Sequence, residues 1–81
     1  MVYVTLTGNL VGVAGGVNKV EVEAANIRQL FNALAERFPS LGPHLDEGVA
    51  VALDGQIFQD TWFEPIPDGS EVHLLPAIAG G

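Results

Sequence analysis

The stretch NIRQLFNALAERFP, residues 26–39, decides the fold of this chain. Its apolar residues recur at i, i+3, i+4, i+7 and i+11, which places them on one stripe of a helix. The stripe consists of Ile27, Leu30, Phe31, Leu34 and Phe38. Burying one large apolar side chain contributes about 1.5 to 3 kcal/mol, so the whole stripe contributes on the order of 10 kcal/mol. We therefore predict one main helix that covers the core.

Both ends of this helix carry local signals. Asn26 followed three residues later by Gln29 has the form of a capping box, in which the Asn26 side chain accepts from the Gln29 amide and Gln29 reaches back. At the other end, Pro39 pushes the residue before it out of helical backbone. The helix is therefore expected to begin after Asn26 and to stop before Pro39.

Two strands are predicted before the helix. Val2, Val4 and Leu6 alternate with more polar residues, which is the period of a half-buried strand. Residues 17–22 alternate in the same way and are expected to pair with the first strand as a hairpin. Residues 8–16, with four glycines, are expected to form a wide loop and a possible mobile rim of that hairpin.

Three further strands are predicted after the helix. The expected elements are a loop or short irregular turn over 40–48, a strand over 49–53, a turn at Asp54-Gly55, a short return strand over 56–58, a turn over 67–69 and a last strand over 71–75. In the last strand, Val72 and Leu74 should face the core, while His73 and Leu75 should face outward. Pro76 lacks an amide donor and is expected to end the ladder.

This order of elements is that of an α+β, ubiquitin-like β-grasp. The class has a mixed sheet of four to five strands with one main helix packed on one face, and the long connection through the helix permits a parallel strand pair. We expect residues 1–76 to form this one domain. Residues 77–81, AIAGG, have no turn chemistry and are expected to form a flexible tail.

Composition excludes several classes of function. Ten acidic residues against three basic ones give a formal charge of −7, which disfavours nucleic acid and anionic membrane surfaces as partners. The chain has no cysteine, and His44 and His73 have no second ligand at metal-binding spacing, so no metal site is expected. The Met1 region lacks the layout of a signal peptide and no apolar run could cross a bilayer, so a cytoplasmic location is predicted.

Beyond the element order, two segments resemble the MoaD/ThiS group of ubiquitin-like sulfur carriers. One is IPDGSEV, residues 66–72, and the other is the ending LPAIAGG, residues 75–81. The ending is the more specific of the two when it follows the first at this distance. It differs from the commonest molybdopterin-type ending in having Ala77 where a second proline is frequent.

The resemblance implies a carrier protein that is not an enzyme by itself. In this family an E1-like adenylating enzyme uses ATP to activate the terminal carboxylate, here that of Gly81, and a sulfur donor converts it to a thiocarboxylate. No cofactor would be stably bound. Gly80 would be the slim neighbour, with Pro76, Ala77, Ile78 and Ala79 as the guide into the partner's channel. A second partner would be a sulfur-accepting synthase subunit, with molybdopterin synthesis favoured over thiamine or cysteine synthesis.

Docking should use apolar residues near the tail. Leu75 is the best single anchor, because it is expected to face outward next to Pro76. Phe58 is expected in the core, whereas Trp62 and Phe63 are further candidates for partner binding and their location is left open.

Two rival functions remain open. A ubiquitin-like modifier would join the activated Gly81 to a target lysine through an amide bond. A plain interaction module would make no chemical use of its Gly-Gly ending. The sequence leaves open the pathway, the identity of the synthase, protein conjugation and the oligomeric state.

Overall fold

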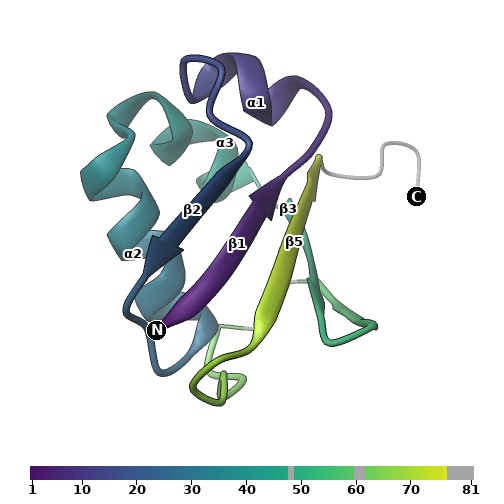
Figure 1. Cartoon of the computed structure of the whole chain (residues 1–81). Helices are drawn as coiled ribbons and strands as arrows, with labels where there is room; N and C mark the ends of the chain where they lie inside the picture. Colours follow the sequence, from purple (N-terminus) through teal and green to yellow (C-terminus); the bar gives the residue numbers. More distant parts are fainter. Residues whose placement is uncertain (48, 60–61, 77–81) are drawn as a thin grey trace.

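The computed structural model describes residues 1–47, 49–59 and 62–76. Within them one mixed sheet has the strand order β2-β1-β5-β3-β4. Its strands are β1 (Val2–Leu6), β2 (Lys19–Val22), β3 (Val49–Leu53), β4 (Gln56–Phe58) and β5 (Glu71–Pro76). The pair β1·β5 is parallel and the other pairs are antiparallel, as the β-grasp prediction requires. The helices lie together on one side of this sheet (Figure 1).

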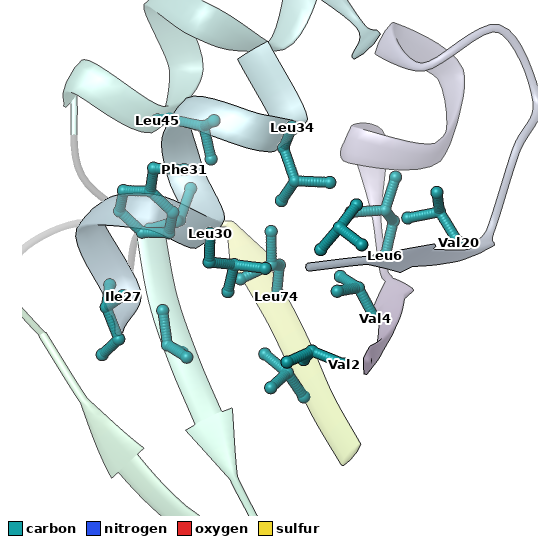
Figure 2. Close-up of a cluster of buried hydrophobic side chains, with 14 of the residues drawn as sticks. Val2, Val4, Leu6, Val20, Ile27, Leu30, Phe31, Leu34, Leu45 and Leu74 are labelled. Atoms are coloured by element: carbon teal, nitrogen blue, oxygen red, sulfur yellow. The ribbon is translucent and has the colours of Figure 1, made fainter. Parts of the chain in front are cut away.

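The core lies between the sheet and these helices. Strand β1 shows the predicted alternation, since Val2, Val4 and Leu6 are buried. Figure 2 shows these side chains pointing into the same space as those of the main helix and of Leu74 from β5. Leu74 is 0% exposed, so the last strand is anchored at the centre of the core.

The main helix, α2 (Ile27–Arg37), has the predicted bounds. Its stripe is buried except for Phe38, which is the C-cap residue and only partly buried. Asn26 Oδ1 accepts from the Gln29 amide at 2.8 Å, which confirms the cap. Gln29 Oε1 reaches back to the N–H of Ala25 at 2.9 Å, one residue before the cap itself. The sequence therefore fixes where this helix begins.

Two segments predicted as loops contain short helices instead. The Gly-rich segment 8–16 contains α1 (Asn9–Val13), and the segment after Pro39 forms η1 (Pro39–Leu41) and α3 (Gly42–Glu47). Each segment buries two residues four positions apart, Leu10 with Ala14 and Leu41 with Leu45. Side chains at i and i+4 share one helix face, so burial against the core stabilises helices too short to form alone.

The turns leading into β4 and β5 are as predicted. Asp54 and Gly55 both have positive φ, 48° and 89°, which is the geometry of a two-residue hairpin turn joining β3 to β4. In the 67–69 turn, the Ser70 amide donates to the Pro67 carbonyl at 3.2 Å and Gly69 has a φ of 84°. Strand β5 runs one residue further than expected, because Pro76 still pairs with Val49.

Candidate functional site

Strand β5 delivers the C-terminal end of the chain from the interior of the sheet. It lies between β1 and β3 and pairs with both. Its last described residue is Pro76, opposite Val49. The predicted site residues Gly80 and Gly81, with the guide residues 77–79, lie outside the described residues. What the structure defines is the point and the surroundings from which this segment begins.

Among the described residues, no helix covers the face of the sheet opposite α2, which we call the open face, and this face carries Leu75. Its neighbours follow from the register: Leu75 pairs with Ala50, His73 pairs with Ala52, and Ala52 pairs with Ile57. Directly paired residues share a face, as do residues two apart in a strand, so Leu75 and Ile57 belong to the same surface. The predicted orientation of β5 is confirmed, with Leu74 buried and Leu75 half-buried on the other side.

Ile57 is the residue of this surface that the sequence prediction missed. It is 58% exposed, an unusual value for an isoleucine in a strand. Between Leu75 and Ile57 the strand β3 contributes only the small side chains of Ala50 and Ala52. Ala50 is fully buried, so we refer to Leu75, Ala52 and Ile57 as the open-face patch. Ile57 could have been found by pairing the predicted short return strand, residues 56–58, with the Ala-containing strand before it, residues 49–53.

The other half of the open face is polar. Tyr3 pairs with Glu21 and Glu71, and Thr5 pairs with Lys19 and His73. These rows line a surface depression of about 790 Å³. Its lining mixes carboxylates with cationic groups, so the open face changes from polar over β2 and β1 to apolar over β3 and β4.

Trp62 lies on the helix side of the molecule, away from the open-face patch. Its ring meets the ring of Phe31 edge-on, with centroids 5.5 Å apart. Trp62 is 38% exposed, whereas its neighbour Phe63 is 76% exposed. The structure therefore does not bring Trp62 together with Leu75. Phe58 packs against the core as predicted.

The segment around Trp62 also closes the N-terminus of α2. The Arg28 amide donates to the Trp62 carbonyl at 2.8 Å, and the Ile27 amide donates to the Glu64 carbonyl at 3.1 Å. Together with the Asn26 cap, these bonds satisfy the first free amides of the helix. Because these amides already have partners, this helix end offers no ready anion site.

The charged amino group at the start of the chain takes part in one ion pair on the surface. The Met1 ammonium group forms an ion pair with the Asp68 carboxylate. The hydrogen bond to Asp68 raises the pKa of the Met1 amino group above its ordinary value, and the same bond lowers the pKa of Asp68. The pair ties the start of β1 to the 67–69 turn, where the Gly69 amide also donates to the Met1 carbonyl at 2.8 Å.

The described residues contain no group of three or more His, Cys, Asp or Glu side chains that could hold a metal ion. In the same part of the chain, no helix is long and apolar enough to cross a membrane. What the described structure offers is a strand end beside an apolar surface.

Solved structures of other proteins share the fold of this chain. The chain is 22% identical to a chain in the BexX/CysO complex of Amycolatopsis orientalis, covering 100% of both chains with a TM-score of 0.81, which shows the shared fold. It is 27% identical to SAMP1 from Haloferax volcanii, covering 99% of this chain and 98% of that one with a TM-score of 0.72. It is 25% identical to a chain in the complex of subunits 1 and 2 of the molybdopterin-converting factor from Helicobacter pylori, covering 99% and 97% with a TM-score of 0.68.

Sequence similarity, in addition to the fold, identifies the family of this chain. No curated protein sequence gives a significant match. A family model described as the ThiS family matches residues 4–81, which includes β2, β3, β4, β5 and the part of β1 from Val4 onward, and extends through the Gly80-Gly81 ending. The match covers nearly the whole chain, so this protein belongs to the ThiS family.

Proposed function

We propose that this chain is a sulfur carrier whose working group is the carboxylate of Gly81. The observation that carries the proposal is that the family match runs through Gly80 and Gly81, directly after a strand that ends at Pro76. A terminal Gly-Gly alone is common. In a ThiS-family chain, after a central strand that ends beside an apolar surface, it has a chemical use.

The chemistry requires help from other proteins. A carboxylate is a poor electrophile, so an E1-like adenylating enzyme would join the Gly81 carboxylate to the AMP portion of ATP and release pyrophosphate. Hydrosulfide released by the sulfur donor would then attack the acyl carbon and expel AMP with its bridging oxygen, and loss of the sulfur-bound proton would leave a thiocarboxylate. ATP and the sulfur donor belong to the partners, and this chain supplies the acyl group.

The position of the carboxyl group follows from simple geometry. Five residues follow Pro76, and at about 3.3 to 3.6 Å each a fully extended segment would reach roughly 17 Å from the body. The two glycines lack Cβ atoms and would fit a narrow channel that admits little more than backbone. The folded part therefore acts as a handle that the partner binds while the end reacts elsewhere.

We further propose that the partners dock on the open-face patch. Leu75 lies one residue before Pro76, so a partner that covers the patch is already next to the emerging chain. Ile57 offers the larger exposed apolar area on the same surface. Phe63 remains a second candidate contact on the helix side, whereas Trp62 covers Phe31. The charge of −7 would also favour a partner with a basic surface around its channel.

The recipient of the sulfur is proposed to be a synthase subunit. Similarity to a chain in the complex of subunits 1 and 2 of a molybdopterin-converting factor supports this kind of assembly. Molybdopterin synthesis is the first pathway to test, followed by thiamine and cysteine synthesis.

Intact mass spectrometry tests the carrier function directly. The full chain is incubated with the E1-like adenylating enzyme of the source organism, ATP and a sulfur donor. Replacement of one carboxylate oxygen by sulfur adds about 16 Da to the chain. The matched control omits ATP. An unchanged mass under complete conditions, with the activating enzyme shown to be active, would contradict the proposal.

A second function is favoured by one comparison. SAMP1, a small archaeal modifier protein, is 27% identical to this chain over nearly its whole length. In a modifier the same activated Gly81 would form an amide with a lysine of a target. Conjugates that resist denaturing electrophoresis and thiol reagents, and that disappear when Gly81 is deleted, would support this function.

A further inference from the structure

Strands β1 and β5 separate at a point fixed by Thr7. The Thr7 amide donates to the Leu74 carbonyl at 3.2 Å, and the Thr7 hydroxyl donates to the same carbonyl at 2.8 Å. These two residues are 67 positions apart in the sequence. Thr7 directly follows β1, just before Gly8 turns the chain toward α1, and Leu74 lies in β5.

The parallel ladder cannot continue past this point, for two reasons. The Tyr3 amide donates to the Ser70 carbonyl and the Thr7 amide to the Leu74 carbonyl, so by this alternation the next bond would need a Pro76 amide donating to the Thr7 carbonyl. Proline has no amide hydrogen. The Thr7 carbonyl has another partner as well, because it accepts from the Leu10 amide at 3.2 Å as α1 begins.

The doubled bond therefore fixes the last peptide unit shared by β1 and β5. That unit joins the Leu74 carbonyl to the Leu75 amide, and alternation along the strand directs the Leu75 amide toward β3, where Ala50 is its partner. The unit is held from both sides of the strand. Only one residue, Leu75, separates it from Pro76.

We propose that Thr7 is a positioning residue whose hydroxyl fixes the direction in which the C-terminal segment leaves the sheet. This inference rests on the proposed carrier function. An activating enzyme that docks on the folded body must receive the chain end at one place. When the exit direction is fixed in advance, a larger fraction of molecules is ready to bind, and the apparent affinity rises in proportion.

The matched substitutions are Thr7→Val and Thr7→Ser. Valine keeps the shape and removes the hydroxyl, while the Leu74 carbonyl retains the bond from the residue 7 amide. Serine keeps the hydroxyl. Hydrogen exchange followed by NMR should show the Leu75 amide exchanging about 2- to 10-fold faster in Thr7→Val than in wild type, with Thr7→Ser near wild type. Equal exchange rates would overturn the proposed clamp.

Steady-state kinetics of pyrophosphate release, with the E1-like adenylating enzyme of the source organism, then test the role in activation. Thr7→Val should raise KM for the carrier by about 2- to 10-fold and leave kcat unchanged, and Thr7→Ser should restore KM. Unfolded carrier would also raise the apparent KM, so the folded fraction of each variant is measured first by its melting curve. A rise in KM no larger than the loss of folded fraction would overturn the positioning role.

The outcomes separate the two proposals. If wild type is activated and Thr7→Val has the wild-type KM, the positioning role is wrong while the carrier function stands. If wild type itself is never activated, the carrier function fails and the positioning role fails with it. Faster Leu75 exchange together with an unchanged KM would also overturn the positioning role, because the clamp would then have no effect on activation.

Discussion

The substitution Ile57→Ala tests the docking surface most directly. Ile57 is 58% exposed in the free chain, so a partner that covers the open-face patch would bury most of this exposed side-chain surface. Full burial of an isoleucine side chain contributes about 1.5 to 3 kcal/mol, and 58% of that range is roughly 0.9 to 1.7 kcal/mol. The dissociation constant for the activating enzyme should therefore rise about 5- to 20-fold.

The assay is isothermal titration calorimetry of the full chain with the adenylating enzyme, with each variant first shown to keep its melting temperature. Phe63→Ala is the comparison variant, since Phe63, the second candidate contact, is 76% exposed but lies beside Trp62, which contacts the helix side. Binding that is lost in Phe63→Ala and retained in Ile57→Ala would refute the reasoning. Docking would then use the segment around Trp62 in place of the sheet.

Three further predictions concern the chain end, one turn and one ion pair. Gly81→Ala should leave the melting temperature unchanged and abolish pyrophosphate release. Gly12→Ala, where an added Cβ meets nothing within 4 Å, should retain activity. A fully active Gly81→Ala would contradict the narrow-channel argument. Gly69→Ala should lower the free energy of unfolding, measured with urea, by about 1 kcal/mol, because Gly69 has a φ of +84°. Gly12→Ala is again the comparison, and an equal loss of stability in both variants would contradict this prediction. The ordinary pKa values are 3.8 for the Asp68 carboxyl and 8.0 for the Met1 amino group, and folding lowers the first and raises the second. The stabilisation by the Met1–Asp68 pair should therefore be complete between pH 3.8 and pH 8.0. The difference in melting temperature between wild type and Asp68→Asn should then shrink below pH 3.8 and above pH 8.0, and a difference independent of pH would argue against the pair.

Several elements could be predicted because their signals are local. The stripe of α2 and its Asn26 cap lie within one continuous stretch, so both ends of the helix follow from nearby residues. The Asp54-Gly55 turn is specified by the two residues that adopt positive φ. The short helices α1 and α3 were missed because their stability comes from burying Leu10, Ala14, Leu41 and Leu45 against residues far away in the chain.

The residues of the candidate site also differ in whether a local sequence signal could identify them. The sequence identified Leu75 as outward-facing, since alternation within one strand decides that orientation. It did not identify Ile57, which joins Leu75 on one surface only through the register of β3 with both β4 and β5. Thr7 was missed for the same reason, because its partner Leu74 is 67 residues away.

The sequence by itself determined the order of the strands and the main helix, and the Gly-Gly ending, because strand and helix periodicity, turn chemistry and a terminal motif are properties of neighbouring residues. Residues 77–81 lie outside the described structure, so the assignment of the working carboxylate rests on the sequence and on the family match. Only the tertiary structure decided where the last strand lies, what holds its end and which apolar residues surround it. Strand pairing brings together residues that are distant in the chain, and no local pattern encodes those contacts.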